Sequence, residues 1–150
     1  MANQRTGIRM SDEEAWAFIG ECRNLQFATL NRDGSPHLTT LSFGIDDEAI
    51  FFDTYAKAQK AVNIARDPRV CLLFETGIVY EEMRGATVNG RAALVKDPAQ
   101  SVALKAAIGT RYDPDTPDAA HREASQKTEG KRVVFRVVPE KIISWDHRKL

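Results

Sequence analysis

Short apolar segments separated by turn-forming residues dominate the first third of the chain. Residues 25–30, Leu-Gln-Phe-Ala-Thr-Leu, are rich in strand formers, and residues 31–36 are dense in turn formers. A second segment of mixed apolar and polar residues covers 37–45, and a tight turn then leads into a third segment at 49–53. Three short strands joined by turns predict an antiparallel meander.

Helix signals interrupt this β pattern. Ser11 and Glu14 have the spacing of a capping box, which predicts that a helix begins there. Residues 57–66 are helix formers, residues 98–108 begin with a proline suited to the first turn of a helix, and residues 119–127 favour a weak helix. The helices are thus expected to be few and short.

Four further strands are predicted in the second half of the chain. They cover residues 70–74, 84–95, 131–138 and 141–145, with Pro139 separating the last two. The apolar run at 70–74 is expected to be buried on both faces. Six or seven strands with turn-like links predict a mainly β fold with flanking helices, in which an antiparallel sheet closes on itself and removes exposed edges.

Composition and charge narrow the class of protein. A length of 150 residues fits a single domain over residues 1–150, and 43% hydrophobic with 28% charged residues is an ordinary globular mixture. Because 21 basic and 21 acidic residues cancel, we expect a small-molecule substrate and no nucleic-acid partner. No apolar run suits a signal peptide or a membrane span, so we expect a cytoplasmic protein without a membrane partner.

Cysteines and histidines show no spacing typical of a metal or redox site. Cys22 and Cys71 are far apart, and Cys71 lies in an apolar run where a thiol packs as a small hydrophobe. His37, His121 and His147 have no metal-ligand spacing either. We therefore expect no metal site.

The best candidate for ligand binding is the junction between the third strand and the following helix, residues 51–60. Backbone N–H groups at a helix start lack intrahelical partners and attract anions. Thr54 adds a hydroxyl group, and Lys57 and Lys60 are three residues apart, which places them on one side of the predicted helix. These groups could hold one phosphate, or both lysines could be ordinary solvated charges.

Several segments keep a characteristic order and spacing over nearly the whole chain. They are Phe27-Ala28-Thr29-Leu30, the DGSPHLTTLSF hairpin, KAQKAVN, ARDPRVCLLFE, RGATVNGRAALV and PEKIISWDHRKL. Together they resemble the pyridoxamine 5′-phosphate oxidase-like family, especially its branch of flavin- and deazaflavin (F420)-dependent oxidoreductases. The resemblance implies a six- or seven-stranded antiparallel split β-barrel, the FMN-binding split barrel, which works as a homodimer.

The same resemblance implies roles for individual residues. Thr39 and Thr40 would lie on the strand beneath the cofactor ring and phosphate, and Thr54 would hydrogen-bond the phosphate. Lys60 matches a lysine that clamps the phosphate, and Trp145 matches a tryptophan that reaches the partner subunit's cofactor. No catalytic residue is implied, because hydride chemistry belongs to the cofactor.

The chain also departs from the oxidase pattern. Ala58-Gln59-Lys60 replaces Ser-Arg-Lys, so a bidentate phosphate contact is lost that a lysine cannot reproduce, although Lys57 could restore the charge. The sequence after Trp145 lacks an Arg-Leu-His-Asp-Arg segment that grips pyridoxal phosphate, so oxidation of pyridoxamine phosphate is not expected. The C-terminal sequence resembles that of the F420-binding branch. F420 carries a polyglutamate tail, and Arg148, Lys149 or Lys57 could offer it positive partners.

The function implied is transfer of a hydride from reduced F420 to a small unsaturated organic acceptor. FMN is the alternative cofactor, as in an FMN-dependent pyridoxamine 5′-phosphate oxidase-like flavoprotein. A different class is a non-catalytic protein that stores a flavin or binds haem, with a histidine as axial ligand. Arg111 and Tyr112, before a proline-rich loop, either line a substrate pocket or anchor the loop.

Overall fold

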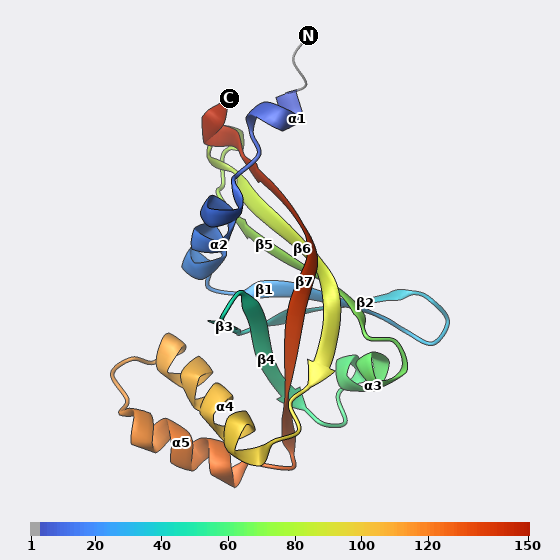
Figure 1. Ribbon diagram of the computed structural model, residues 1–150, viewed down its shortest axis with the longest axis vertical. Coiled ribbons are helices and arrows are strands. Elements are labelled where there is room, and N and C mark those ends of the chain that lie inside the picture. Colours follow the sequence, from blue (N-terminus) through green and yellow to red (C-terminus); the bar gives the residue numbers. More distant parts are fainter. Residues whose placement is uncertain (1–3) are drawn as a thin grey trace.

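A seven-stranded antiparallel sheet, curled into a half-open barrel, forms the centre of the protein in the computed structural model, which describes residues 4–150 (Figure 1). The strand order is β2-β1-β5-β6-β7-β4-β3, and every pairing is antiparallel. The strands are β1 (Leu25–Leu30), β2 (Pro36–Leu41), β3 (Gly44–Asp46), β4 (Ala49–Tyr55), β5 (Arg69–Thr76), β6 (Arg84–Leu94) and β7 (Arg132–Asp146). The predicted mainly β split barrel of six or seven antiparallel strands is confirmed, and the observed number is seven.

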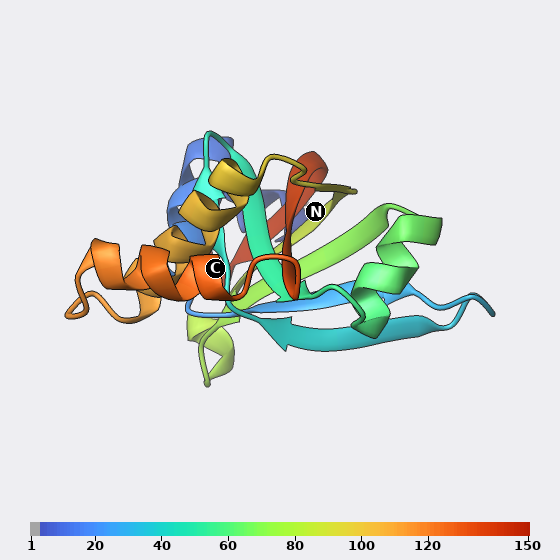
Figure 2. The same cartoon turned by 90° about the horizontal axis from the view of Figure 1, so that it is seen from below.

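Short helices flank the barrel, with α3 on one side and the α4–α5 pair on the other (Figures 1 and 2). They are α1 (Gln4–Gly7), α2 (Asp12–Glu21), α3 (Gln59–Arg66), α4 (Pro98–Tyr112) and α5 (Asp118–Lys127), with 3₁₀ turns η1 (Tyr80–Glu82) and η2 (His147–Lys149). The predicted capping box is confirmed: the Glu14 N–H donates to Ser11 Oγ at 3.1 Å, and the Ser11 N–H donates to the Glu14 carboxylate at 2.7 Å. None of the helices in the described part of the chain is long and apolar enough to cross a membrane.

The predicted strand at 37–45 is wrong in its extent, because the structure divides it into β2 and β3. These two strands pair with different partners, β1 and β4, and form the two edges of the sheet. Phe43 lies between them, fully buried, with its ring centroid 5.0 Å from that of Phe74. Burial of the Phe43 side chain favours an interruption of the strand here, where the chain passes from the β2 edge of the sheet to the β3 edge.

Two predicted strands around Pro139 are one continuous strand, β7. Pro139 lies opposite Gly90 and Lys141 lies opposite Asn89, so Glu140 is the extra residue of a β-bulge. Pairing of β7 with β4 ends at Val137, so the missing N–H of Pro139 removes no bond to that neighbour. The bulge in the β6–β7 ladder, together with the unpaired side of β7 beyond Val137, therefore accommodates the proline without ending the strand.

Aromatic rings fill the barrel interior. The Phe52 ring lies 4.5 Å from that of Phe27 and 5.7 Å from that of Phe135, measured between centroids. The prediction that 70–74 is buried on both faces is wrong, because burial alternates along β5 and Cys71 lies on the half-buried outer face. Partial burial still raises the pKa of the Cys71 thiol above its usual value.

Arg111 and Tyr112 anchor the end of α4 to the segment between α2 and β1. The Arg111 guanidinium donates to the carbonyl oxygens of Gly20 (2.9 Å) and Cys22 (2.8 Å). The Tyr112 hydroxyl donates to the carbonyl oxygen of Arg23 and accepts from the Phe43 N–H at 3.2 Å. Of the two expected roles, the contacts fit loop anchoring.

Replacing Tyr112 with phenylalanine is expected to lower the free energy of unfolding by about 1 kcal/mol, because two hydrogen bonds are lost. The expected change appears as a lower urea midpoint with an unchanged slope. Tyr80→Phe is the matched control, since Tyr80 is 61% exposed. An equal midpoint for the Tyr112→Phe variant and the unmodified protein would contradict the anchoring role.

Candidate functional site

The junction between β4 and α3 is an uncapped helix start beside a buried hydroxyl group. Thr54, the penultimate residue of β4, is only 4% exposed, and it lies on the same face of the strand as buried Phe52. The N-cap residue of α3, Ala58, makes no side-chain hydrogen bond to the helix. The first N–H groups of α3 thus receive no side-chain cap and can donate to an anion.

Lys60 is half-buried at this junction and has no acidic partner among residues 4–150. Burial, and secondarily the positive charge of Arg132, lower the pKa of Lys60. The nearby carboxylate of Asp53 is already engaged by the Arg132 guanidinium, which also lies 4.6 Å from the centroid of the Tyr55 ring. A partly dehydrated ammonium group beside a second cation attracts an anion.

The prediction that Lys57 and Lys60 share one side of a helix is wrong. Helix α3 begins only at Gln59, so Lys57 lies in the preceding turn, where its side chain is exposed. The backbone of Ala58 is extended, with φ −63° and ψ 148°, so the helix cannot begin before Gln59. The two lysines therefore approach the junction from different segments.

Asn63 fixes α3 against β1, a role that sequence reasoning missed. Its side chain is fully buried, and its amide nitrogen donates to Thr29 Oγ1 and Asn31 Oδ1, each at 3.0 Å. Its amide oxygen accepts from Gln59 Nε2 at 2.8 Å and from Arg66 at 3.3 Å. A polar residue on the apolar face of an amphipathic helix was the available signal.

An open cleft of about 550 Å³ lies beside the start of α3. It is lined by polar residues from three segments, the turn after β1, the start of β2 and the beginning of α3: Asn31, Arg32, Asp33, His37 and Gln59. The cleft thus adjoins the uncapped helix start, and the donors described above are next to open space.

Thr39 and Thr40 lie on neighbouring positions of β2 and point to opposite faces. Thr39 is opposite Phe27 on the core side, and its hydroxyl oxygen is buried without a hydrogen-bond partner among the described residues. Thr40 is opposite Gln26 and is exposed on the outer face. The two hydroxyl groups therefore cannot contact the same face of one ligand.

Trp145 lies at the far end of β7 from this junction. Thr54 pairs with Val133, and from there to Trp145 the strand extends roughly 40 Å at about 3.3 Å per residue. The indole lies across Gly85, where an added Cβ would be 2.0 Å from the ring. Figure 1 shows the C-terminal end of β7, which carries Trp145, far from the junction of β4 and α3, so one chain does not bring Trp145 together with Thr54 and Lys60.

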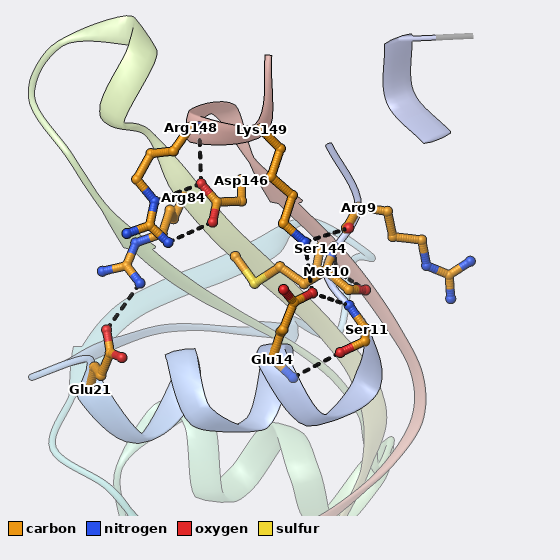
Figure 3. Close-up of polar contacts among 10 residues, drawn as sticks. All are labelled: Arg9, Met10, Ser11, Glu14, Glu21, Arg84, Ser144, Asp146, Arg148 and Lys149. Carbon is orange, nitrogen blue, oxygen red and sulfur yellow. Dashed lines mark hydrogen bonds and ion pairs between the residues drawn. The ribbon is translucent and has the colours of Figure 1, made fainter. Parts of the chain in front are cut away.

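The cations at the C-terminal end are held by ion pairs within the chain. Arg148 pairs with Asp146 at 2.6 Å, and Lys149 pairs with Glu14 at 2.7 Å (Figure 3). The Arg148 guanidinium lowers the pKa of Asp146 below its usual value. Arg148 and Lys149, expected as partners of a polyglutamate tail, are thus already engaged.

Two of the three histidines have ring nitrogens engaged by backbone carbonyl groups. His121 Nε2 lies 2.9 Å from the Asp113 oxygen, and His147 Nδ1 lies 2.7 Å from the Tyr80 oxygen. His37 lies in the open cleft beside α3. Over residues 4–150, no group of three or more His, Cys, Asp or Glu side chains could hold a metal ion.

Known sequences identify the family. A family model described as pyridoxamine 5′-phosphate oxidase matches residues 11–146. A pyridoxine/pyridoxamine 5′-phosphate oxidase from Cupriavidus taiwanensis is 33% identical over 90 residues, which cover 59% of this chain and 41% of that protein. The chain thus matches about two-fifths of the length of this curated relative.

Solved structures extend the similarity to the whole barrel. A conserved hypothetical protein from Mycobacterium tuberculosis has a TM-score of 0.90 at 37% identity, covering 99% of this chain and 92% of that one. An F420 reductase has a TM-score of 0.68 at 25% identity, covering 88% of this chain and 98% of that one. The chain belongs to the pyridoxamine 5′-phosphate oxidase family, a family of flavin-binding oxidoreductases with a split-barrel fold.

Proposed function

We propose that this protein is an oxidoreductase that uses the reduced deazaflavin coenzyme F420 to transfer a hydride to a small unsaturated organic acceptor. The family supports the reaction class, and the likeness to an F420 reductase supports this coenzyme. The observation that carries the proposal is Lys60, a half-buried cation without a carboxylate partner in the described chain, at the uncapped start of α3.

The residues at this junction fit the phosphate group of such a coenzyme. Thr54 offers a hydroxyl group, the first turn of α3 offers N–H donors, and Lys60 offers a charge-assisted hydrogen bond. Lys57 is near enough in sequence to add a second charge from the turn. Burial, and secondarily repulsion from Arg132, lower the pKa of Lys60, and a bound anion would offset that repulsion.

The coenzyme, when bound, supplies the hydride chemistry, and the chain supplies binding and orientation. We assign Thr39 and Thr40 to the strand beneath the ring. The two side chains point to opposite faces of β2. Thr40 can contact a ligand on the outer face, whereas Thr39 lies on the core side of the strand. A small-molecule acceptor would stack on the exposed side of the ring.

The proposal requires a homodimer. Because Trp145 and Lys60 are at opposite ends of the barrel, Trp145 can approach a coenzyme only when the partner subunit supplies it. The outer face of the sheet carries apolar side chains that a second copy would cover, among them Leu38, which is 66% exposed, and half-buried Leu73. Burial of such a face stabilises subunit association.

FMN is the alternative coenzyme, because the curated relatives are named pyridoxine/pyridoxamine 5′-phosphate oxidases. A non-catalytic flavin- or haem-binding role is the other candidate. Haem would need an axial ligand, and His37, whose ring has no hydrogen bond within the described chain, is the histidine available for it. An absorbance spectrum with a Soret band would identify haem.

Lys60→Gln is expected to weaken coenzyme binding about tenfold, because one charge-assisted hydrogen bond to phosphate is lost. Binding is measured by fluorescence quenching as protein is titrated with F420 and, separately, with FMN. Lys127→Gln, which removes an exposed lysine on α5, is the matched control and should leave both affinities unchanged.

Two outcomes would contradict the proposal in different ways. Tight FMN binding with no response to F420 would reject the deazaflavin and leave the phosphate site standing. Unchanged affinity for both coenzymes in a Thr54→Ala, Lys60→Ala variant would show that the phosphate site itself is misplaced.

A further inference from the structure

A second groove, of about 550 Å³, lies at the other end of β7, between the N-terminal segment and the last residues of that strand. Hydrogen bonds at Ile8 and Met10 hold the N-terminal segment, residues 5–10, beside β7. The Asp146 N–H donates to the Ile8 oxygen at 2.7 Å, and the Met10 N–H donates to Ser144 Oγ at 3.2 Å. Figure 1 shows this segment beside the C-terminal end of the chain, far from α3. The groove is therefore separate from the proposed phosphate site.

The residues lining this groove include four basic side chains and no acidic one: Arg5, Arg9, Lys141 and His147. Neighbouring cations outside the groove are neutralised by three ion pairs: Arg84–Glu21 at 3.0 Å, Arg148–Asp146 at 2.6 Å and Lys149–Glu14 at 2.7 Å (Figure 3). Arg9 and Lys141, in contrast, form no ion pair within the described chain, and the Arg9 guanidinium points away from these three pairs in Figure 3. Arg9 and Lys141 thus keep two positive charges in the groove that no ion pair within the described chain balances.

Acidic residues on the other side of the N-terminal segment do not supply this balance. Asp12, Asp47, Glu48 and Glu140 line an adjacent depression that also reaches Arg9 and Lys141, and Glu140 pairs with Arg91 at 3.0 Å. None of these acidic side chains comes within ion-pair distance of Arg9 or Lys141. Arg9 and Lys141 therefore lie between the basic groove and the acidic depression. Both side chains are available to an anion in the basic groove.

Apart from Ser144, the remaining wall of the groove is apolar. Trp145 lies flat over Gly85, and Ile8, Ile142 and Ile143 extend the apolar surface. Ile143 is 45% exposed, a large apolar side chain without full cover. A pocket of several hundred Å³ that combines an apolar wall with a few polar groups is typical of small-molecule sites.

We propose that this groove binds a small organic anion with an apolar body, whose carboxylate or phosphate head contacts Arg9 and Lys141 and whose body lies against Trp145. Binding at this groove does not depend on the proposed function. Only its role does: if Trp145 approaches the coenzyme of the partner subunit, the groove is where the hydride acceptor is held, and the acceptor is an amphipathic anion.

The emission of Trp145 reports this binding directly. Trp16→Phe leaves Trp145 as the single tryptophan, since the chain has only two. Coenzyme-free protein is titrated with decanoate, decyl phosphate and decanol. Binding of either anion with at least tenfold preference over decanol supports the site, and the two anions distinguish a carboxylate from a phosphate head. Equal affinity for all three ligands, or no change in emission up to millimolar ligand, overturns it.

Matched variants test which residues carry the charge. Lys141→Gln and Arg9→Gln should each weaken binding of the preferred anion about tenfold. Lys127→Gln, an equal charge change on α5, should leave it unchanged. Equal weakening by all three variants would indicate a nonspecific charge effect and overturn the assignment. Occupation of the groove by a second copy of the chain would also overturn it, and would appear as failure of every probe together with dissociation of the dimer in the Lys141→Gln variant.

The outcome is distinguishable from that of the proposed function. The titrations contain no coenzyme, so a failure of the Lys60 experiment leaves them unaffected. Gly85→Ala tests the apolar wall separately. The added Cβ would displace the Trp145 indole, while Arg9 and Lys141 remain. Loss of anion binding in this variant, with an unchanged circular dichroism spectrum, supports the apolar wall, and unchanged binding argues against it.

Discussion

Replacing Asn63 with leucine is expected to lower the free energy of unfolding by about 3 kcal/mol, because buried polar groups lose their partners at about 1–3 kcal/mol each. Thr29, which is 2% exposed, and Asn31 each lose the donor that reaches their side-chain oxygen. The Gln59 amide nitrogen loses its acceptor. Leucine has the same number of side-chain heavy atoms as asparagine and is bulkier, so the substitution leaves no cavity. Urea denaturation measures the change in the free energy of unfolding.

The same substitution should weaken coenzyme binding about tenfold, since a shifted α3 would misplace its N–H donors and Lys60. Val62→Ala is the control, because Val62 lies on the same helix but is 50% exposed. Affinity is measured under conditions where both variants are folded. A stable Asn63→Leu variant would contradict the structural role, and a destabilised variant with full coenzyme affinity would show that α3 does not orient the site.

Removing the acidic partner of a buried lysine is expected to cost more than removing the lysine itself. Lys105, only 6% exposed, donates to Glu129 at 2.6 Å and to the Ser125 carbonyl oxygen at 3.0 Å, joining α4 to the end of α5. Glu129→Gln leaves a buried charge without its counterion and is expected to cost about 2 kcal/mol, below the full value for a buried pair because water reaches Glu129. Lys105→Met keeps the volume, frees Glu129 to turn to water, and is expected to cost less than about 1 kcal/mol.

Thermal or urea unfolding of the two variants decides this prediction. Glu123→Gln is the matched control, because its ion pair with Lys127 on α5 is exposed and should contribute less than about 0.5 kcal/mol. A larger loss from Lys105→Met than from Glu129→Gln would mean that the aliphatic packing of the lysine, rather than its charge, joins the two helices.

Elements with local signals were predictable from the sequence, and elements set by their neighbours were not. The capping box at Ser11 and the strand Leu25–Leu30 follow from adjacent residues and were confirmed. Pro139 normally argues for a strand end, but the bulge that accommodates it depends on pairing with Gly90, which is distant in sequence. The division of 37–45 into two strands likewise depends on which neighbours each half meets.

The candidate site shows the same division. The Thr54–Lys60 junction was recognisable because a strand end and a helix start are contiguous in the chain. The lowered pKa of Lys60 was not, because it depends on burial and on Arg132, which reaches the site from β7. Asn63 was missed for a related reason, since its partners belong to β1 and the turn that follows.

In the topology of the sheet, the segment containing α4 and α5 connects two antiparallel neighbours, β6 and β7, in the way that a hairpin loop does. The chain leaves β6 at Leu94 and re-enters β7 at Arg132, and these two strands are already direct neighbours at that point, with Leu94 opposite Phe135. Shortening or replacing the connection would leave the order of the seven strands unchanged. Sequence drift among relatives is therefore expected to concentrate in this segment, while the barrel strands stay in place.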